Sequence, residues 1–115
     1  MNLEEFYAAT GGNYADTKRR LMSDAIVRKF VLKYREDPTC AELEAAIEAK
    51  DWETAFRGAH TLKGLSQNLG FDRLFETSFA LTEALRGPKP LEDMSLWTAV
   101  QKVNAELLGA IEKIQ

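Results

Sequence analysis

The chain has almost none of the residues that cross-link small proteins. Cys40 is its only cysteine and His60 its only histidine among 115 residues. A disulfide within the chain is therefore excluded, and a zinc site of the usual ligand count cannot be built. We expect no metal ion or other cofactor in this chain. A lone cysteine also fits a reducing compartment, so we expect a cytoplasmic protein.

Long apolar runs, a basic N-terminal region and an excess of positive charge are also missing. No stretch reaches the ~18 apolar residues of a membrane-spanning helix. The opening MNLEEFYAAT carries two glutamates and does not predict a signal peptide. The net charge of −3 argues against nucleic acid as the main partner, because phosphate binding usually needs a basic field. We expect binding to neither membrane nor nucleic acid.

What the chain does have is the composition of one packed domain. Hydrophobic residues make up 45% and charged residues 29%, as in ordinary globular proteins. The length suits a single domain over residues 1–115 with a core of its own.

Between a few breaks, apolar residues recur at intervals of three and four, the period of an amphipathic α-helix. No alternating strand pattern occurs. Glycine and proline interrupt the pattern at 11–12, at 38 and at 87–90. We predict six helices, over 2–10, 16–34, a short one from 39, 51–70, 72–86 and one from about 93. Short links favour antiparallel neighbours, so the expected fold is all-α, an antiparallel four-helix bundle with one or two additional short helices.

Local signals predict how these helices begin and which side chains they bury. The expected N-caps are Asn2, Asp16, Thr39 (with Glu42 as a capping box), Asp51 and Asp72. The expected buried stripe of the 16–34 helix is Leu21, Met22, Ala25, Ile26, Phe30 and Leu32. The candidates for burial in the 72–86 helix are Leu74, Phe75, Phe79, Leu81, Thr82 and Leu85.

The stretch AHTLKGLSQNLG, residues 59–70, places the only histidine in a helix that contains a glycine. At roughly 100° per residue, the core stripe of this helix comprises Trp52, Ala55, Phe56, Ala59, Leu62, Ser66 and Leu69. His60 lies beside that stripe and should be exposed, with Gly64 and Gln67 following on the same strip. Lys63 lies between strip and core, from where its ammonium can reach toward the imidazole.

Gly64 is the costly member of this strip. A glycine inside a helix lowers its stability by about 1 kcal/mol relative to alanine. The cost makes sense if another molecule must come close to His60, because a bare backbone leaves room for it. Arg57, three residues before His60, adds positive charge. The strip therefore has the features of a docking surface for an anion or an acidic partner.

This pattern, His60, Lys63, Gly64, Ser66 and Leu69–Gly70 followed by a second amphipathic helix, resembles the histidine-containing phosphotransfer domain of bacterial and eukaryotic phosphorelays. The resemblance covers about residues 52–86. It implies that His60 accepts a phosphoryl group from an aspartyl phosphate on a receiver domain and passes it to another receiver. Lys63 would neutralise charge on the transferring group, and Gln67 would hydrogen-bond a phosphoryl oxygen. The chain would be a phosphocarrier rather than a stand-alone enzyme.

The same resemblance implies the partner. It is a response-regulator receiver domain, free or within a hybrid sensor histidine kinase, and this receiver supplies the magnesium ion. Since each predicted helix has one apolar stripe, no second large apolar face is left, and we expect a monomer.

Two other function classes stay open. A histidine kinase dimerisation domain also phosphorylates a helical histidine, but it typically has an acidic residue directly after it and a proline nearby. Here Thr61 follows His60, and the chain contains no ATP-binding domain. A helical adaptor that binds a signalling partner without phosphoryl transfer would show the same pattern. Incubation with a phosphorylated receiver separates these alternatives.

Overall fold

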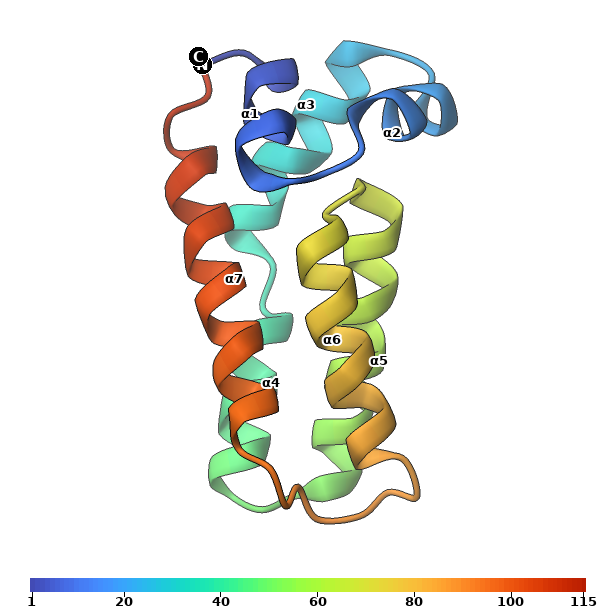
Figure 1. Cartoon of the computed structure of the whole chain (residues 1–115), viewed down its shortest axis with the longest axis vertical. Coiled ribbons are helices and arrows are strands. Elements are labelled where there is room, and N and C mark those ends of the chain that lie inside the picture. The colour runs from blue at the N-terminus through green and yellow to red at the C-terminus, as the bar shows by residue number, and fades with distance from the viewer.

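The long helices run side by side along the molecule, next to a column of shorter helices that follow one another, and two further short helices lie at one end (Figure 1). The computed structural model describes residues 1–115. Its elements are α1 Leu3–Thr10, α2 Tyr14–Leu21, α3 Asp24–Lys33, the 3-10 helix η1 Tyr34–Glu36, α4 Thr39–Glu48, α5 Trp52–Leu69, α6 Asp72–Leu85 and α7 Ser95–Ile111. The predicted fold class, an all-α bundle, is confirmed. None of the helices combines the length and hydropathy needed to span a bilayer.

The helix predicted over 16–34 is in fact two helices, so the number of α-helices is seven rather than six. Met22 closes α2 in the left-handed conformation, with φ of 76°. Ser23 then caps α3, because its side chain accepts a hydrogen bond from the amide of Ile26 at 3.2 Å. Asn13, not Asp16, caps α2. A serine cap in mid-segment thus outweighs an apolar pattern that runs through it.

The buried face of α3 also differs from the prediction. Val27 and Val31 are fully buried, whereas Met22, Ile26 and Phe30 are 85%, 41% and 38% exposed. Apolar residues lie on both sides of this helix, so periodicity alone cannot select the inner one. Packing against neighbouring helices selects the inner side. Just beyond α3, the buried ring of Tyr34 reaches α7, and its hydroxyl donates to Asn104 Oδ1 at 2.6 Å.

After η1 the chain passes Pro38 and continues as α4, so α3, η1 and α4 follow one another down the molecule (Figure 1). Helix α4 turns Leu43, Ala46 and Ile47 inward. The predicted capping box at Thr39 is absent. Instead the carboxylate of Asp37 accepts a hydrogen bond from the Thr39 amide at 2.9 Å.

Helices α5 and α6 pack closely and antiparallel because small side chains line their contact (Figure 1). Ser66 and Ser78 are both buried there, with 3.5 Å between their hydroxyl oxygens. Phe79, which the sequence predicts to be in the core, is 45% exposed. It lies beside the buried face of α6, which Leu74, Ser78, Leu81 and Leu85 form. The other predicted residues of α6 are buried, apart from the partly buried Phe75.

Both ends of α5 are held firmly. Asp51 caps its first turn as predicted, accepting a hydrogen bond from the Thr54 amide at 3.2 Å. Gly70 ends it with φ of 70°, and a Cβ there would collide with Thr17 of α2. Arg20 of α2 donates to the carbonyls of residues 67 and 68 at 3.1 and 3.0 Å. The helix that carries His60 is thus anchored to the end cap formed by α1–α3.

Candidate functional site

His60 stands exposed in the middle of α5, as predicted. Its imidazole is stacked on the ring of Phe56, with 6.4 Å between ring centroids and 22° between ring planes. The two residues are four apart, so they share one helix face. Side chains of an α-helix lean toward its N-terminus, which brings the imidazole over the turn that holds Phe56.

The other, C-terminal side of the imidazole is open. A side chain at position 64 would lean back over His60 for the same reason that His60 leans over Phe56. Gly64 has none, and a Cβ built there meets no atom within 4 Å. Nothing in the chain's own packing therefore requires glycine at this position. The bare backbone leaves room for another molecule beside the ring.

Lys63 is partly buried at the margin of the strip, but its ammonium does not take the direction expected from the sequence. It lies over the ring of Phe79 in α6, 5.3 Å from the centroid, within the range of a cation–π contact. The positive charge of Lys63 also reaches Glu83. The pKa of that carboxyl is held below its ordinary value, first by a hydrogen bond from Arg86 and more weakly by the charges of Arg86 and Lys63.

Arg86 is a cation beside the site that sequence reasoning missed. Its guanidinium carbon lies 5.4 Å from the centroid of Phe56, and two hydrogen bonds of 3.1 and 2.9 Å join it to Glu83. Helices α5 and α6 are antiparallel about a tight link at 70–71, so residues equally distant from the link face one another. That rule, applied to the sequence, would have placed the end of α6 beside Phe56. Arg57, the predicted source of positive charge, is instead paired with Glu53 at 3.4 Å.

Gln67 is exposed one turn beyond Gly64, as the strip predicted. Its backbone carbonyl accepts a hydrogen bond from Arg20 at 3.1 Å. The structure thus gathers His60, Gly64 and Gln67 on one exposed strip of α5, with Lys63 at its edge. The roles of these four residues stay predictions.

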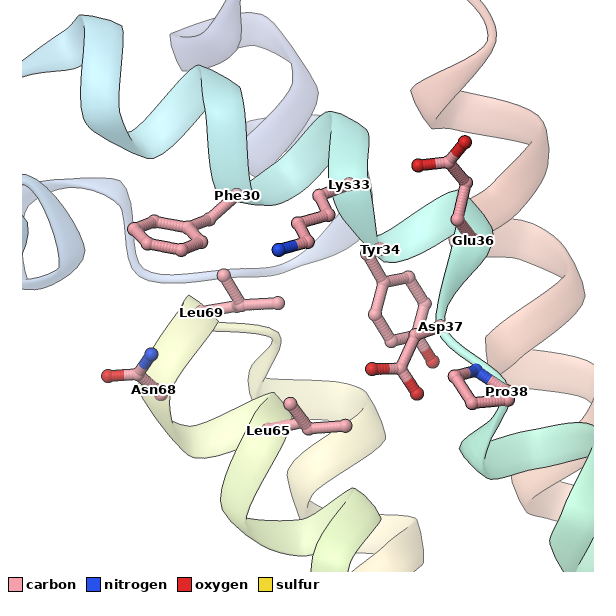
Figure 2. A pocket seen from close by; sticks show the side chains of 9 residues that line it. All are labelled: Phe30, Lys33, Tyr34, Glu36, Asp37, Pro38, Leu65, Asn68 and Leu69. Carbon is pink, nitrogen blue, oxygen red and sulfur yellow. The ribbon is translucent and has the colours of Figure 1, made fainter.

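A cavity of about 350 Å³ opens near this strip, on the neighbouring face of α5 (Figure 2). In Figure 2 the side chains of Phe30 and Lys33 face Leu65 and Leu69 across it. Its lining residues are Phe30, Lys33, Tyr34, Glu36, Asp37, Pro38, Leu65, Asn68 and Leu69. None of the four predicted site residues is among them. A small-molecule site is normally concave, so the exposed strip suits a macromolecular partner better than a small ligand.

Cys40 is the other side chain that could act as a strong nucleophile. It is partly buried, and burial raises the pKa of its thiol to about 11. The thiolate is the reactive form, so Cys40 is nearly unreactive at neutral pH. No group of three or more histidine, cysteine or acidic side chains is placed to hold a metal ion. Of these two side chains, only His60 is exposed.

Comparison with protein families gives an independent finding. The family model described as the Hpt domain matches residues 30–114. The match includes the whole of α4, α5, α6 and α7, whereas α1, α2 and most of α3 lie outside it. Neither the curated proteins nor the solved structures gave a significant match.

Proposed function

The chain belongs to the Hpt domain family, and we propose on this premise that His60 accepts a phosphoryl group from an aspartyl phosphate of a receiver domain and passes it to another receiver. Hpt domains carry phosphoryl groups in two-component signalling and are not kinases. One observation carries the assignment to His60. The only histidine of the chain is exposed at mid-helix, with open space on the side of Gly64.

The proposed step is an in-line displacement at phosphorus. The lone pair of His60 Nε2 forms the N–P bond while the bond from phosphorus to the aspartate oxygen breaks, and the aspartate leaves as a carboxylate. Nδ1 keeps its proton during the attack, so the ring attacks as neutral imidazole. Transfer to the second receiver runs the same exchange in reverse, with that receiver's carboxylate as nucleophile. The receiver supplies the magnesium ion.

Lys63 and Gln67 assist from the same strip. The contact between the Lys63 ammonium and Phe79 contributes only about 0.5–1 kcal/mol at an exposed site. A phosphoryl group with its negative charge can therefore draw the ammonium away from the ring and be neutralised by it. Gln67 can donate a hydrogen bond from its amide to a phosphoryl oxygen. Gly64 leaves the approach free.

The partner follows from this chemistry. It is a receiver domain, either a free response regulator or part of a hybrid sensor histidine kinase, and the exchange takes place in the cytoplasm between a monomer of this chain and that receiver. A flat, exposed strip around a single nucleophile supports a protein partner that brings its own metal ion and its own phosphoryl group.

A transfer assay tests the proposal. The chain is mixed with each of a panel of receivers carrying a radiolabelled aspartyl phosphate, and the label is followed on both proteins. We expect label on the wild-type chain and none on His60→Gln, which should keep the helical circular dichroism spectrum because residue 60 is exposed. Lys63→Ala should slow transfer roughly tenfold without abolishing it, since one of several charges is removed. A receiver that binds without losing its label would favour the adaptor alternative.

A further inference from the structure

We propose that Phe56 is a positioning residue for His60 and that Arg86 holds Phe56 in place. The inference rests on the proposed function, because it concerns how the phosphoryl-accepting ring is oriented. From the sequence alone, Phe56, four residues before His60, is predicted only to belong to the core stripe of α5. The structure gives it a second contact on the outside of the helix.

The stack is the contact that restrains the imidazole. His60 is exposed, so the orientation of its ring depends on the neighbour that it packs against. Phe56 is partly buried and packs against the core on its inner side, which leaves its outer side to the imidazole and to Arg86. Nearly parallel planes at 6.4 Å correspond to the offset stacking that aromatic pairs favour. A rigid apolar surface therefore lies along one side of an otherwise free nucleophile.

Arg86 ties this surface to the neighbouring helix. It follows directly after α6, so its contact with Phe56 crosses from one helix to the other. A planar guanidinium stacks well on an aromatic ring. Its own position is set by the two hydrogen bonds to Glu83, three residues earlier. Glu83 therefore positions Arg86, Arg86 contacts Phe56, and Phe56 packs against His60.

The consequence is a defined direction of attack. An unrestrained exposed histidine samples several rotamers, and only some direct Nε2 away from the helix. Phe56 closes the N-terminal side of the imidazole, whereas Gly64 leaves the C-terminal side open. Holding the ring in one orientation raises the fraction of encounters that begin aligned. The expected gain is about three- to tenfold in the maximal rate of transfer, with no change in receiver affinity.

Substitutions at position 56 distinguish the effect of the aromatic ring from that of an apolar side chain of similar size. Phe56→Leu keeps an apolar side chain but removes the aromatic face, and Phe56→Tyr restores it. We expect Phe56→Leu to lower the maximal transfer rate about three- to tenfold at an unchanged half-saturating receiver concentration, and Phe56→Tyr to return it to the wild-type rate. Phe30→Leu, which removes a ring of α3 that lines the cavity on the neighbouring face of α5, is the control and should leave the rate unchanged.

A spectroscopic readout tests the contact without a partner. In proton–carbon NMR spectra, the ring current of Phe56 should shift the carbon-bound protons of the His60 ring. That shift should vanish in Phe56→Leu and persist in Phe56→Tyr. Since Arg86 acts through Phe56, Arg86→Gln should reduce the rate about twofold in the wild-type background and have no effect in Phe56→Leu.

Three results would overturn the inference while leaving the proposed function intact. They are a Phe56→Leu chain that transfers at the wild-type maximal rate, one in which only the half-saturating receiver concentration rises, and His60 resonances that do not move. The middle result would make Phe56 a docking residue. A wild-type chain that accepts no label from any receiver would instead defeat the proposed function itself, and the positioning role with it.

Discussion

Gly64 and Gly109 are both exposed glycines of long helices, and a Cβ built at either position meets no atom within 4 Å. Gly64 lies one turn from His60 in α5, whereas Gly109 lies in the last turn of α7, far along the chain from the histidine. Gly64→Gln and Gly109→Gln should both raise the free energy of unfolding by about 0.5 kcal/mol, because glutamine is the better helix former. Denaturant unfolding measures this effect.

Their effects on transfer should differ. The side chain of Gly64→Gln would lean over His60 and obstruct the approach of a receiver, so phosphoryl transfer should be largely lost. Gly109→Gln should transfer at the wild-type rate. If Gly64→Gln also transfers normally, the glycine does not serve partner access, and its cost in helix stability must have another reason.

At the residue scale, the sequence was sufficient to predict which residues share the exposed face of α5, but not where their side chains point. The helical period placed His60, Gly64 and Gln67 on one exposed strip, since that depends only on angles within α5. The period of α5 alone does not show that the Lys63 ammonium lies over Phe79, because that contact depends on the register of α5 against α6. Arg86 is found only when the two helices are also paired about the link at 70–71.

At the scale of elements, the junction between α2 and α3 carries a testable cost. Met22 is 85% exposed yet holds a left-handed conformation that L side chains disfavour by about 1–2 kcal/mol. Met22→Gly removes this strain and loses little packing, so it should raise the free energy of unfolding by about 1 kcal/mol. Thermal and denaturant unfolding measure the change.

Met94→Gly is the matched control, because Met94 is also exposed but has an ordinary helical conformation, with φ of −66°. Glycine at position 94 relieves no backbone strain and increases the conformational entropy of the unfolded chain. The free energy of unfolding should therefore fall slightly. A Met22→Gly chain that is less stable than wild type would show that the side chain of Met22 contributes more than its strained backbone costs.

The same junction shows where element prediction from sequence fails. The bounds of α5 and the end of α6 follow from strong caps and breaks, such as Asp51, Gly70 and the proline-rich link after Leu85. In α3, by contrast, Val27 and Val31 compete with Ile26 and Phe30 for the core, and both faces satisfy the helical period. Only the packing of neighbouring elements decides between them.

At the scale of the whole molecule, the arrangement of α3 bears on oligomeric state. Its exposed Ile26 and Phe30 form an apolar surface. The sequence prediction of a single apolar stripe on each helix, all of it buried, did not include such a surface. Lys29 and Lys33 lie among them, so two copies meeting at this surface would bring like charges together. We therefore still predict a monomer. Sedimentation equilibrium at micromolar concentration should fit a single species of 12.9 kDa, and a tight dimer would contradict this and revive the dimerisation-domain alternative.

The central claim is that the chain carries phosphate on His60, and the chemistry of the labelled bond tests it most directly. After transfer from a phosphorylated receiver, the wild-type chain should be digested and the label located by mass spectrometry and by its stability. We predict a phosphoramidate: label on the peptide containing His60, lost in acid and retained in alkali. Label on any other residue, label that survives acid, or no label from any receiver would contradict this claim.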